Sequence, residues 1–480
     1  MWKRHLLHYA AQLYARPVTS VTRHFAASST AVLRVQGLRR TCIVSPDAAL
    51  WSGMAKMTQS RSSHMSSIKD RRAYDEKAFQ HVKGSDVESL DLVSDGRLVS
   101  VKWADGKTSP FHSVWLRSVC FCPKCRMDHT GQSIVEFDNI SSKSRILSAE
   151  DDGEGCLTVQ WKEDPGHTGI FPLKFLKAQC YSKESLEEIR NNVQMTFSKD
   201  MVIPSFQHDE VLASRKALYK WVKALNETGI SVVKGVPRGP GTGKQVVQRI
   251  AELLQHTVYG EVDNIKRDPR PINAAYTPKK LELHMDQVMY ESPPGVQALH
   301  CIEFDENIVG GENIFVDMFE VVEAYRKQYP KEFDILCEVP VGFETLHYDR
   351  DWPTHMIHRR PTFATNKYGD LTGVVWNPHH IAALQVEEEL VEPFFDAYGK
   401  FYKLINNFSK LFRIRLRAGD MVTFNNRRMS HGRAAFSGDG ERFLQGYYIE
   451  ISEFKSCVQV LSNLEGDGKP PVRVGNYDSL

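Results

Sequence analysis

The sequence predicts a mainly β protein with flanking helices, in which a double-stranded β-helix (jelly-roll) domain follows a small β-rich N-terminal module. Residues 87–117 alternate apolar and polar side chains around two Asp-Gly turns, a pattern typical of a small antiparallel sheet. Helical patterns at 319–336 and 387–407 lie between short apolar strands such as 295–304. Helices outside a core of short strands suit a jelly roll.

The remaining elements divide the chain into two domains. A second hairpin pattern, with 156–161 and 170–176 on either side of a Pro-Gly turn, completes a compact β module at 85–185. An amphipathic helix at 210–227, a strand at 230–236 and a helix at 244–257 follow. Strands flanking a turn are predicted within 412–426. We therefore place the jelly roll at 200–460 and a polar tail at 461–480, and we predict no internal repeat.

The N-terminal 45 residues are basic and free of acidic residues up to Asp47. Such Arg-rich stretches are typical of mitochondrial transit peptides, which predicts the mitochondrial matrix as the location and a linker at 46–84. The alternative is a basic arm that binds an acidic partner. Without its seven cationic side chains the formal net charge falls from +2 to −5, which argues against nucleic acid as a partner. No run of about twenty apolar residues predicts a membrane span.

Three cysteines stand close together in WLRSVCFCPKC, at Cys120, Cys122 and Cys125. The chain has nine cysteines, an odd number, which favours thiols and metal ligands over a disulfide framework. Three thiolates leave tetrahedral Zn²⁺ one ligand short. His167 on the second hairpin would tie the two hairpins together, whereas His129 lies only four residues past Cys125. We expect structural zinc with His167 as fourth ligand; a buried thiol cluster is the alternative.

A second group of metal ligands is predicted in the C-terminal half. His284 and Asp286 are two residues apart in LELHMDQ, so on a strand their side chains share one face. His431 follows in FNNRRMSHGRAAF. Two histidines and one carboxylate hold Fe(II) while leaving positions open for substrate and O₂. Each of these residues alone would more often be a packing or surface residue. The three together, in this order along the chain, favour an oxygenase.

Arg442, in GERFLQGYY, has a planar guanidinium group that can bind a carboxylate through two parallel hydrogen bonds. An anionic co-substrate next to an Fe(II) centre indicates a 2-oxoglutarate-dependent enzyme. GPGTGK at 239–244 resembles a phosphate-binding loop, but Arg238 and Gln245 occupy positions where that motif needs Gly and Ser or Thr. We interpret it as an ordinary loop.

Five motifs together resemble the γ-butyrobetaine dioxygenase family, which includes trimethyllysine dioxygenase. The resemblance covers about residues 88 to 455 and is carried by WLRSVCFCPKC, INAAYTPKKLELHMDQ, PPGVQALHCIE, GGENIFVD and NNRRMSHGRAAF. It implies a zinc module, a catalytic jelly roll, and hydroxylation of a trimethylammonium acid with Fe(II), 2-oxoglutarate and O₂, ascorbate serving as reductant. The implied zinc ligands are Cys120, Cys122, Cys125 and His167. The implied iron ligands are His284, Asp286 and His431, with Arg442 and Asn273 at the co-substrate.

The substrate pocket implied by the resemblance is a cage of aromatic rings around a quaternary ammonium. Tyr259, Tyr276 and Tyr448 fall at aromatic positions of that cage, although single tyrosines are often packing residues. The tryptophan position falls on Asp263, and Gln287 stands where a tyrosine is expected. Asp263 either faces the cation as a counter-charge or belongs to a loop that points away.

The sequence thus predicts an enzyme that hydroxylates γ-butyrobetaine or a closely related trimethylammonium acid and releases succinate and CO₂. Trimethyllysine dioxygenase and another betaine hydroxylase are the enzyme alternatives. A catalytically inactive, zinc-bearing scaffold protein is the alternative of another class, and the intact metal ligands argue against it. A homodimer is compatible with these features, which leave the oligomeric state open.

Overall fold

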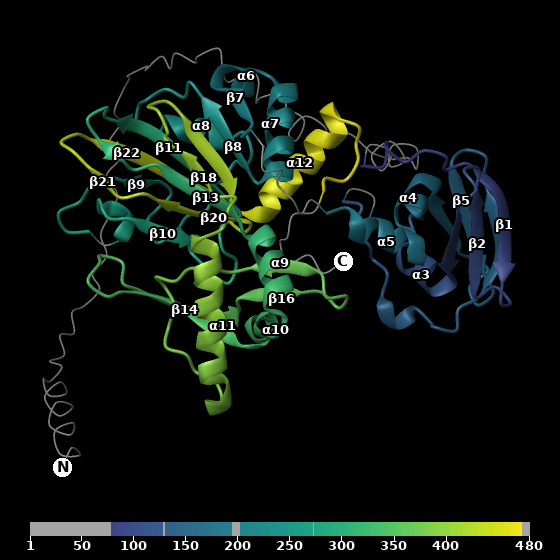
Figure 1. Ribbon diagram of the computed structural model, residues 1–480. Helices are drawn as coiled ribbons and strands as arrows, with labels where there is room; N and C mark the ends of the chain where they lie inside the picture. The colour runs from purple at the N-terminus through teal and green to yellow at the C-terminus, as the bar shows by residue number, and fades with distance from the viewer. Residues whose placement is uncertain (1–77, 128–129, 194–201, 272, 473–480) are drawn as a thin grey trace, which may run out of the picture. The chain divides into compact units, whose positions relative to one another are not determined.

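The computed structural model describes residues 78–127, 130–193, 202–271 and 273–472 (Figure 1). The predicted transit peptide at 1–45 lies outside the described residues, as do most of the predicted linker and His129. Among the described helices, none combines the length and apolar character needed to cross a bilayer.

The N-terminal module contains two three-stranded antiparallel sheets, each followed by a six-residue helix. The first unit comprises β1 (Val87–Val93), β2 (Leu98–Trp103), β3 (Thr108–His112) and α3 (Ser113–Ser118). The second comprises β4 (Ile146–Asp151), β5 (Cys156–Trp161), β6 (Thr168–Pro172) and α4 (Leu173–Ala178). The strands predicted within 87–117 are confirmed. Helix α5 (Lys183–Asn191) continues past residue 185, where the sequence placed the end of the module.

The two units have the same order of strands and helix and form an internal repeat, which the sequence analysis did not predict. Phe111, Leu116 and Cys120 of the first unit correspond to Phe171, Leu176 and Cys180 of the second, and all six are buried. Apolar residues from both units share one core, in which Trp103 and Trp161 are fully buried. The two repeated units therefore bury their apolar faces against each other in this one core.

Two sheets build the C-terminal domain and confirm the predicted jelly roll. The larger sheet has the order β7-β8-β19-β11-β22-β9 and the smaller β10-β20-β13-β18. The larger one comprises β7 (Ser205–Gln207), β8 (Ile230–Lys234), β9 (Asp263–Ile265), β11 (Val296–Phe304), β19 (Met421–Asn425) and β22 (Arg442–Ile449). The smaller one comprises β10 (Leu281–His284), β13 (Asn313–Asp317), β18 (Phe412–Ile414) and β20 (Met429–Arg433). Their apolar faces form one core, in which Phe315 of β13 meets Phe424 of β19 at a ring-centroid distance of 5.0 Å.

Helices α6 (His208–Ala213), α7 (Arg215–Thr228), α8 (Thr242–Val247) and α12 (Ile451–Glu465) share a second core with the larger sheet (Figure 1). The sequence predicted one helix at 210–227, but Ser214 is extended and its side chain caps α7 by accepting from the Ala217 amide. The helix predicted at 244–257 ends at Val247, and Gln255 instead pairs its amide with the Tyr448 carbonyl at 2.9 Å. A backbone hydrogen bond to β22 thus holds Gln255 in a segment that the sequence predicted to be helical.

A third core joins α9 (Met318–Gln328), α10 (Pro330–Glu338) and α11 (Glu388–Asn406) to the smaller sheet. The helix predicted at 319–336 is divided at Pro330, which begins α10 and cannot continue α9. Two hairpins, β14 (Pro340–His347) with β15 (Thr354–Pro361) and β16 (Phe363–Thr365) with β17 (Leu371–Val374), are inserted between these helices. Short pairs also join β12 (Val309–Gly310) to β21 (Phe436–Ser437).

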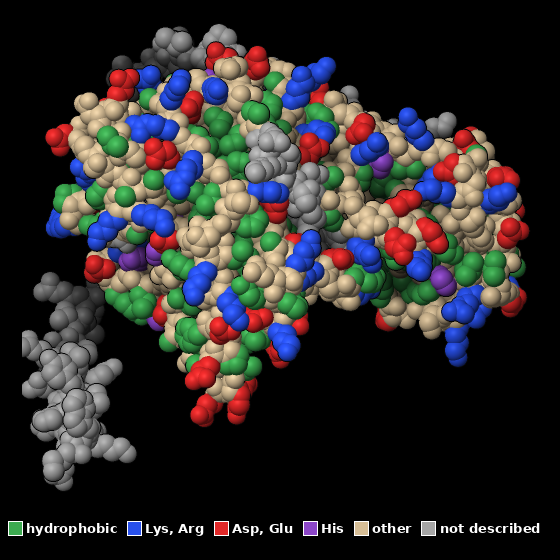
Figure 2. Space-filling model, viewed as in Figure 1, with side chains coloured by type: hydrophobic (Ala, Val, Ile, Leu, Met, Phe, Trp, Pro, Cys, Tyr) green, Lys and Arg blue, Asp and Glu red, His purple; other side chains and the backbone are tan. Residues whose placement is uncertain are grey.

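Helix α12 runs to Glu465, so the polar tail predicted from residue 461 starts later than expected. On the face shown in Figure 2, basic and acidic side chains are interspersed. The segment 239–244 that resembles a phosphate-binding motif is a loop only as far as Gly241, because residues 242–244 form the first half of the six-residue helix α8.

Candidate active site

His284 and His431 face each other across two neighbouring strands of the smaller sheet. They are register partners in the antiparallel pair β10–β20, and their ring centroids are 4.3 Å apart. Both imidazoles are buried, at 6% exposure. Two residues far apart in sequence are thus fixed side by side by backbone pairing.

Asp286 lies two residues beyond the end of β10, and not on the strand as the sequence analysis assumed. Its backbone is held by the Asn426 side chain instead. The Asp286 amide donates to Asn426 Oδ1 at 2.8 Å, and Asn426 Nδ2 donates to the Asp286 carbonyl at 3.0 Å. This double hydrogen bond, rather than strand geometry, turns the carboxylate toward the two histidines.

The three side chains form a compact donor set. Asp286 Oδ1 lies 3.2 Å from His284 Nε2, and Asp286 Oδ2 lies 3.8 Å from His431 Nε2. His284 Nδ1 lies 2.7 Å from the Glu282 carbonyl oxygen, which fixes the tautomer and leaves Nε2 for a metal. All three donor atoms lie within 4.8 Å of one another. Two imidazoles and one carboxylate on one side fit Fe(II) with open positions.

Gln297 and Tyr448 hold the outer oxygen of this carboxylate. Gln297 Nε2 and the Tyr448 hydroxyl each donate to Asp286 Oδ2 at 2.8 Å. The two residues are register partners on β11 and β22. Gln297 was missed in the sequence, although a buried amide inside the apolar run GVQALHCIEF is a signal for such a role.

The charges of the three predicted ligands depend on one another. Burial disfavours the charged form of Asp286, but the hydrogen bond with His284 and the nearby His431 hold its pKa below the ordinary value. Burial likewise opposes protonation of His284, and the bond to Asp286 outweighs it and raises the pKa. Burial, helped by the charge of His284, lowers the pKa of His431 to about 3. A neutral His431 beside an ionised Asp286 is the state that binds a metal.

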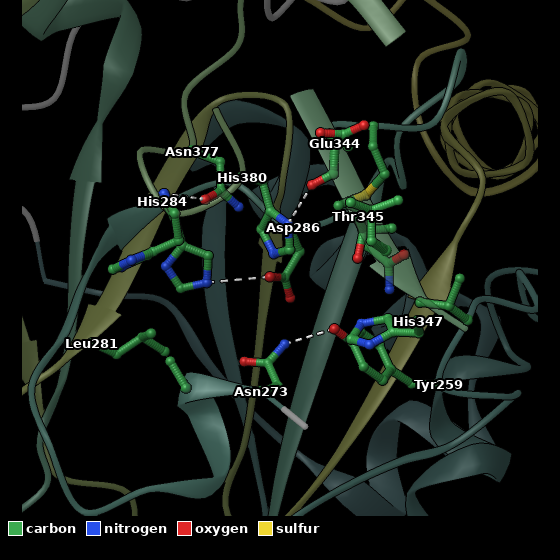
Figure 3. Close-up of a pocket in the computed structure, with 16 residues that line it drawn as sticks. Tyr259, Asn273, Leu281, His284, Asp286, Glu344, Thr345, His347, Asn377 and His380 are labelled. Atoms are coloured by element: carbon green, nitrogen blue, oxygen red, sulfur yellow. Dashed lines mark hydrogen bonds and ion pairs between the residues drawn. The ribbon is translucent and has the colours of Figure 1, made fainter. Parts of the chain in front are cut away.

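A cavity of about 330 Å³ opens beside His284 and Asp286 (Figure 3). Three chain segments supply its walls: Tyr259 with Asn273, the end of β14 from Glu344 to His347, and the stretch from Asn377 to His380. In Figure 3 the Asp286 carboxylate points toward Asn273, whose Nδ2 donates to the Tyr259 hydroxyl at 2.6 Å. The second and third segments were not predicted, since nothing local in the sequence links them to the histidines.

Gln287 is the most strained residue of this cavity wall. It has a positive φ of 60° although it is not glycine, and it is 4% exposed. Neither atom of its amide group has a hydrogen-bond partner among the described residues. Strained backbone and an unsatisfied buried amide are features of ligand sites. Gln287 therefore marks the side of Asp286 where a ligand is expected.

Tyr259, Tyr276 and Asp263 lie together at a second cavity of about 460 Å³. The tyrosine rings meet edge to face at 6.5 Å, and the Tyr276 hydroxyl donates to Asp263 Oδ1 at 2.6 Å. Asp263 is buried, so its loop does not point away. Tyr259 lines both this cavity and the cavity beside the predicted iron ligands His284 and Asp286. Tyr448 differs, because its hydroxyl is bound to Asp286.

Arg442, on β22, is 6% exposed and lies between the rings of Phe304 and Phe436, 5.3 and 5.7 Å from their centroids. No acidic residue in the described parts of the chain forms an ion pair with it, and its Nε has no hydrogen-bond partner there. Burial, with a contribution from neighbouring Arg433, lowers its pKa to about 9. Arg433, by contrast, donates to the carbonyls of Ala275, Thr277 and Lys279. A buried guanidinium without an anion fits a carboxylate ligand.

The four predicted zinc ligands come together in the N-terminal module. His167 Nε2 lies 3.5, 3.3 and 3.6 Å from the Sγ atoms of Cys120, Cys122 and Cys125, and all four residues are buried. Tetrahedral zinc with ordinary bond lengths would separate an imidazole nitrogen from a thiolate by about 3.5 Å. The hydrogen bond from Cys120 lowers the pKa of Cys122 to about 5, while burial opposes this. His129, the competing ligand, lies outside the described residues.

Two family descriptions match the chain. Residues 191–448 match "Taurine catabolism dioxygenase TauD, TfdA family", and residues 90–177 match "Gamma-butyrobetaine hydroxylase-like, N-terminal". The first match spans more than half of the chain. The second coincides with the strands and the cysteines of the N-terminal module.

Characterised relatives extend over most of the chain. A γ-butyrobetaine dioxygenase of Pseudomonas sp. (strain AK-1) is 30% identical, over 76% of this chain and 93% of its own. The human γ-butyrobetaine dioxygenase is 27% identical, over 78% and 97%. The mitochondrial trimethyllysine dioxygenase of Rattus norvegicus is 25% identical, over 73% and 82%. Among solved structures, the non-heme iron oxygenase OrfP with Fe and α-ketoglutaric acid matches at 13% identity and a TM-score of 0.40, over 52% of this chain and 94% of that one.

Proposed function

Since this chain belongs to the TauD, TfdA dioxygenase family, with γ-butyrobetaine and trimethyllysine dioxygenases among its relatives, we propose that it hydroxylates a trimethylammonium acid. γ-Butyrobetaine, which would give L-carnitine, is the first substrate to test. The observation that carries the proposal is the set His284, Asp286 and His431, of which His284 and Asp286 line a cavity that Tyr259 also lines.

In this proposal the three residues hold Fe(II). Fe(II) bound there with 2-oxoglutarate would supply O₂ activation, which would place one oxygen atom in the substrate and the other in succinate, with release of CO₂. Gln297 and Tyr448 keep the Asp286 carboxylate ionised and oriented through their two hydrogen bonds. Glu282 keeps Nε2 of His284 directed at the metal.

The co-substrate is proposed to be held by Arg442 through its distal carboxylate. The guanidinium is buried between two aromatic rings and has no anionic partner in the described chain, so a carboxylate would satisfy it. Asn273 is proposed to lie near co-substrate and substrate, because it lines the cavity beside Asp286 and donates to Tyr259. Ascorbate is proposed as the reductant that keeps iron in the Fe(II) state.

The cationic end of the substrate is proposed to lie against Tyr259 and Tyr276. A trimethylated nitrogen has no N–H to donate, so it is bound through charge and ring faces. Tyr259 and Tyr276 supply such rings at the second cavity. Tyr448 is proposed to contribute its ring, while its hydroxyl remains bound to Asp286.

The test is succinate release by purified protein with Fe(II), 2-oxoglutarate and ascorbate. γ-Butyrobetaine, trimethyllysine and other trimethylammonium acids are compared, and the hydroxylated product is identified by mass spectrometry. We expect equimolar succinate and hydroxylated γ-butyrobetaine; preference for trimethyllysine would assign the alternative activity. Asp286→Ala should abolish turnover because iron loses its carboxylate ligand. If wild-type protein binds iron but turns over no acid in the panel, the result would favour the alternative of a catalytically inactive, zinc-bearing scaffold protein.

The N-terminal module is proposed to bind one structural Zn²⁺ through Cys120, Cys122, Cys125 and His167. Four protein ligands leave no position for catalysis, so the metal would contribute to folding. The sequence composition of residues 1–45 supports a further proposal, import into the mitochondrial matrix. Import of the labelled chain by isolated mitochondria, with and without residues 1–45, tests it.

A further inference from the structure

Asp263 is a buried carboxylate with one free oxygen. It lies at the start of β9 and is 8% exposed. Oδ1 accepts the hydrogen bond from Tyr276, but Oδ2 receives none from any part of the chain that the structure describes. No lysine or arginine there forms an ion pair with it. Burial raises the pKa of Asp263 to about 6, so the carboxylate is mostly ionised at neutral pH. The Tyr276 hydroxyl and the charge of Arg350 offset this cost of burial only in part, which favours a cationic ligand beside the free oxygen.

The space in front of Asp263 suits such a ligand. The cavity of about 460 Å³ is lined by Asp263 together with the rings of Tyr259 and Tyr276. Tyr259 also lines the cavity of Asp286, and Asn273 binds its hydroxyl there. The two cavities thus share Tyr259 as a wall residue, and the charge of Asp286 acts on Asp263, so the two sites are close to each other.

The chain already places one cation at this cavity. The guanidinium carbon of Arg350, on the turn between β14 and β15, lies 5.8 Å from the Tyr259 ring centroid. Arg350 lines the same cavity as Asp263. A positive group is thus accommodated on this ring, while Asp263 Oδ2 remains free.

We propose that Asp263 determines which methylation states the enzyme accepts, and that it extends the substrate class to dimethylammonium acids. This inference rests on the proposed function. A quaternary ammonium interacts with the site through charge and ring faces alone. A protonated tertiary ammonium carries one N–H, which can donate a charge-assisted hydrogen bond to Asp263 Oδ2.

The test compares γ-butyrobetaine with its dimethylamino counterpart, 4-(dimethylamino)butyrate, in wild-type protein and in Asp263→Asn. Asparagine keeps an oxygen for the Tyr276 hydroxyl but replaces the free oxygen by an N–H donor, which opposes the substrate N–H. We expect wild-type protein to hydroxylate both acids. In Asp263→Asn, the ratio of kcat/KM for the dimethyl acid to that for γ-butyrobetaine should fall by about tenfold, because the variant loses a charge-assisted hydrogen bond that only the dimethyl acid can form.

Asp268→Asn is the matched control. Asp268 lines the same cavity but is exposed, and it accepts the Arg270 amide at 2.8 Å. This variant removes the same charge at the rim and should leave the ratio unchanged. An unchanged ratio in Asp263→Asn, or wild-type turnover of γ-butyrobetaine without turnover of the dimethyl acid, would overturn the inference while the proposed function stands. Turnover of no acid in the panel, trimethyllysine included, would overturn both.

Discussion

The Tyr448 hydroxyl donates a hydrogen bond of 2.8 Å to Oδ2 of Asp286, the carboxylate that lies between His284 and His431. The bond stabilises the ionised carboxylate in the orientation in which it reaches both histidines. A residue that the family resemblance assigns to the substrate pocket is therefore also a hydrogen-bond partner of a proposed iron ligand. Its ring and its hydroxyl can be tested separately.

Tyr448→Phe removes only the hydroxyl. We expect affinity for Fe(II) to fall by about 10–100-fold, the usual effect of losing an outer partner of a metal ligand. Titration of Fe(II) or Mn(II) into apoprotein measures it. Tyr447→Phe is the control, because that neighbouring hydroxyl is equally buried but donates to Gln445 at 3.0 Å. Equal metal affinity in both variants would show that the bond to Asp286 contributes nothing to metal binding.

Arg442→Lys tests the co-substrate site. Lysine keeps the charge but not the planar fork, so we expect KM for 2-oxoglutarate to rise by roughly tenfold or more, equivalent to at least about 1.4 kcal/mol. Arg415→Lys serves as the control, because Arg415 stacks on the same Phe304 ring at 4.1 Å but is exposed. A dependence on 2-oxoglutarate that is unchanged in Arg442→Lys would assign the carboxylate to another basic residue.

Local patterns predicted the strands within 87–117, 295–304 and 412–426, since apolar alternation and turn residues act over a few positions. The resemblance and the spacing of cysteines, histidines and aspartate predicted the zinc ligands and the iron ligands. In the structure the members of each of these two sets lie close to one another. Asn426 and the wall from Asn377 to His380 escaped prediction because their positions depend on long-range pairing, whereas Gln297 was overlooked although its amide stands out in an apolar run. Asp286 illustrates the difference between local and long-range effects. Its proximity to His284 was expected from the sequence, but the side chain of Asn426, 140 residues away, holds it there.

Cysteine substitutions in the two repeated units test the zinc site. Cys122→Ser should reduce bound zinc from one per chain to nearly none and lower the thermal midpoint, because structural zinc contributes folding free energy. Cys180→Ser changes the counterpart of Cys120 in the second unit, a buried thiol outside the Cys-His cluster, and should retain zinc. Elemental analysis of both variants measures the metal. Well-folded wild-type protein without zinc would contradict the assignment.

Asp263 also links substrate recognition to stability. Burial raises its pKa from the ordinary 3.8 to about 6, so folding favours its protonated form. Its contribution to stability is fully present below about pH 4 and is lost as the pH rises through about 6. Asp263→Asn, which is neutral throughout, should therefore be more stable than wild type at pH 8 by roughly 1–3 kcal/mol, and the difference should shrink toward pH 4.5. Thermal midpoints of the two proteins across this range measure it, with Asp268→Asn as the exposed control. A difference that does not depend on pH would mean that Asp263 is compensated by a partner and is not free to bind a cation.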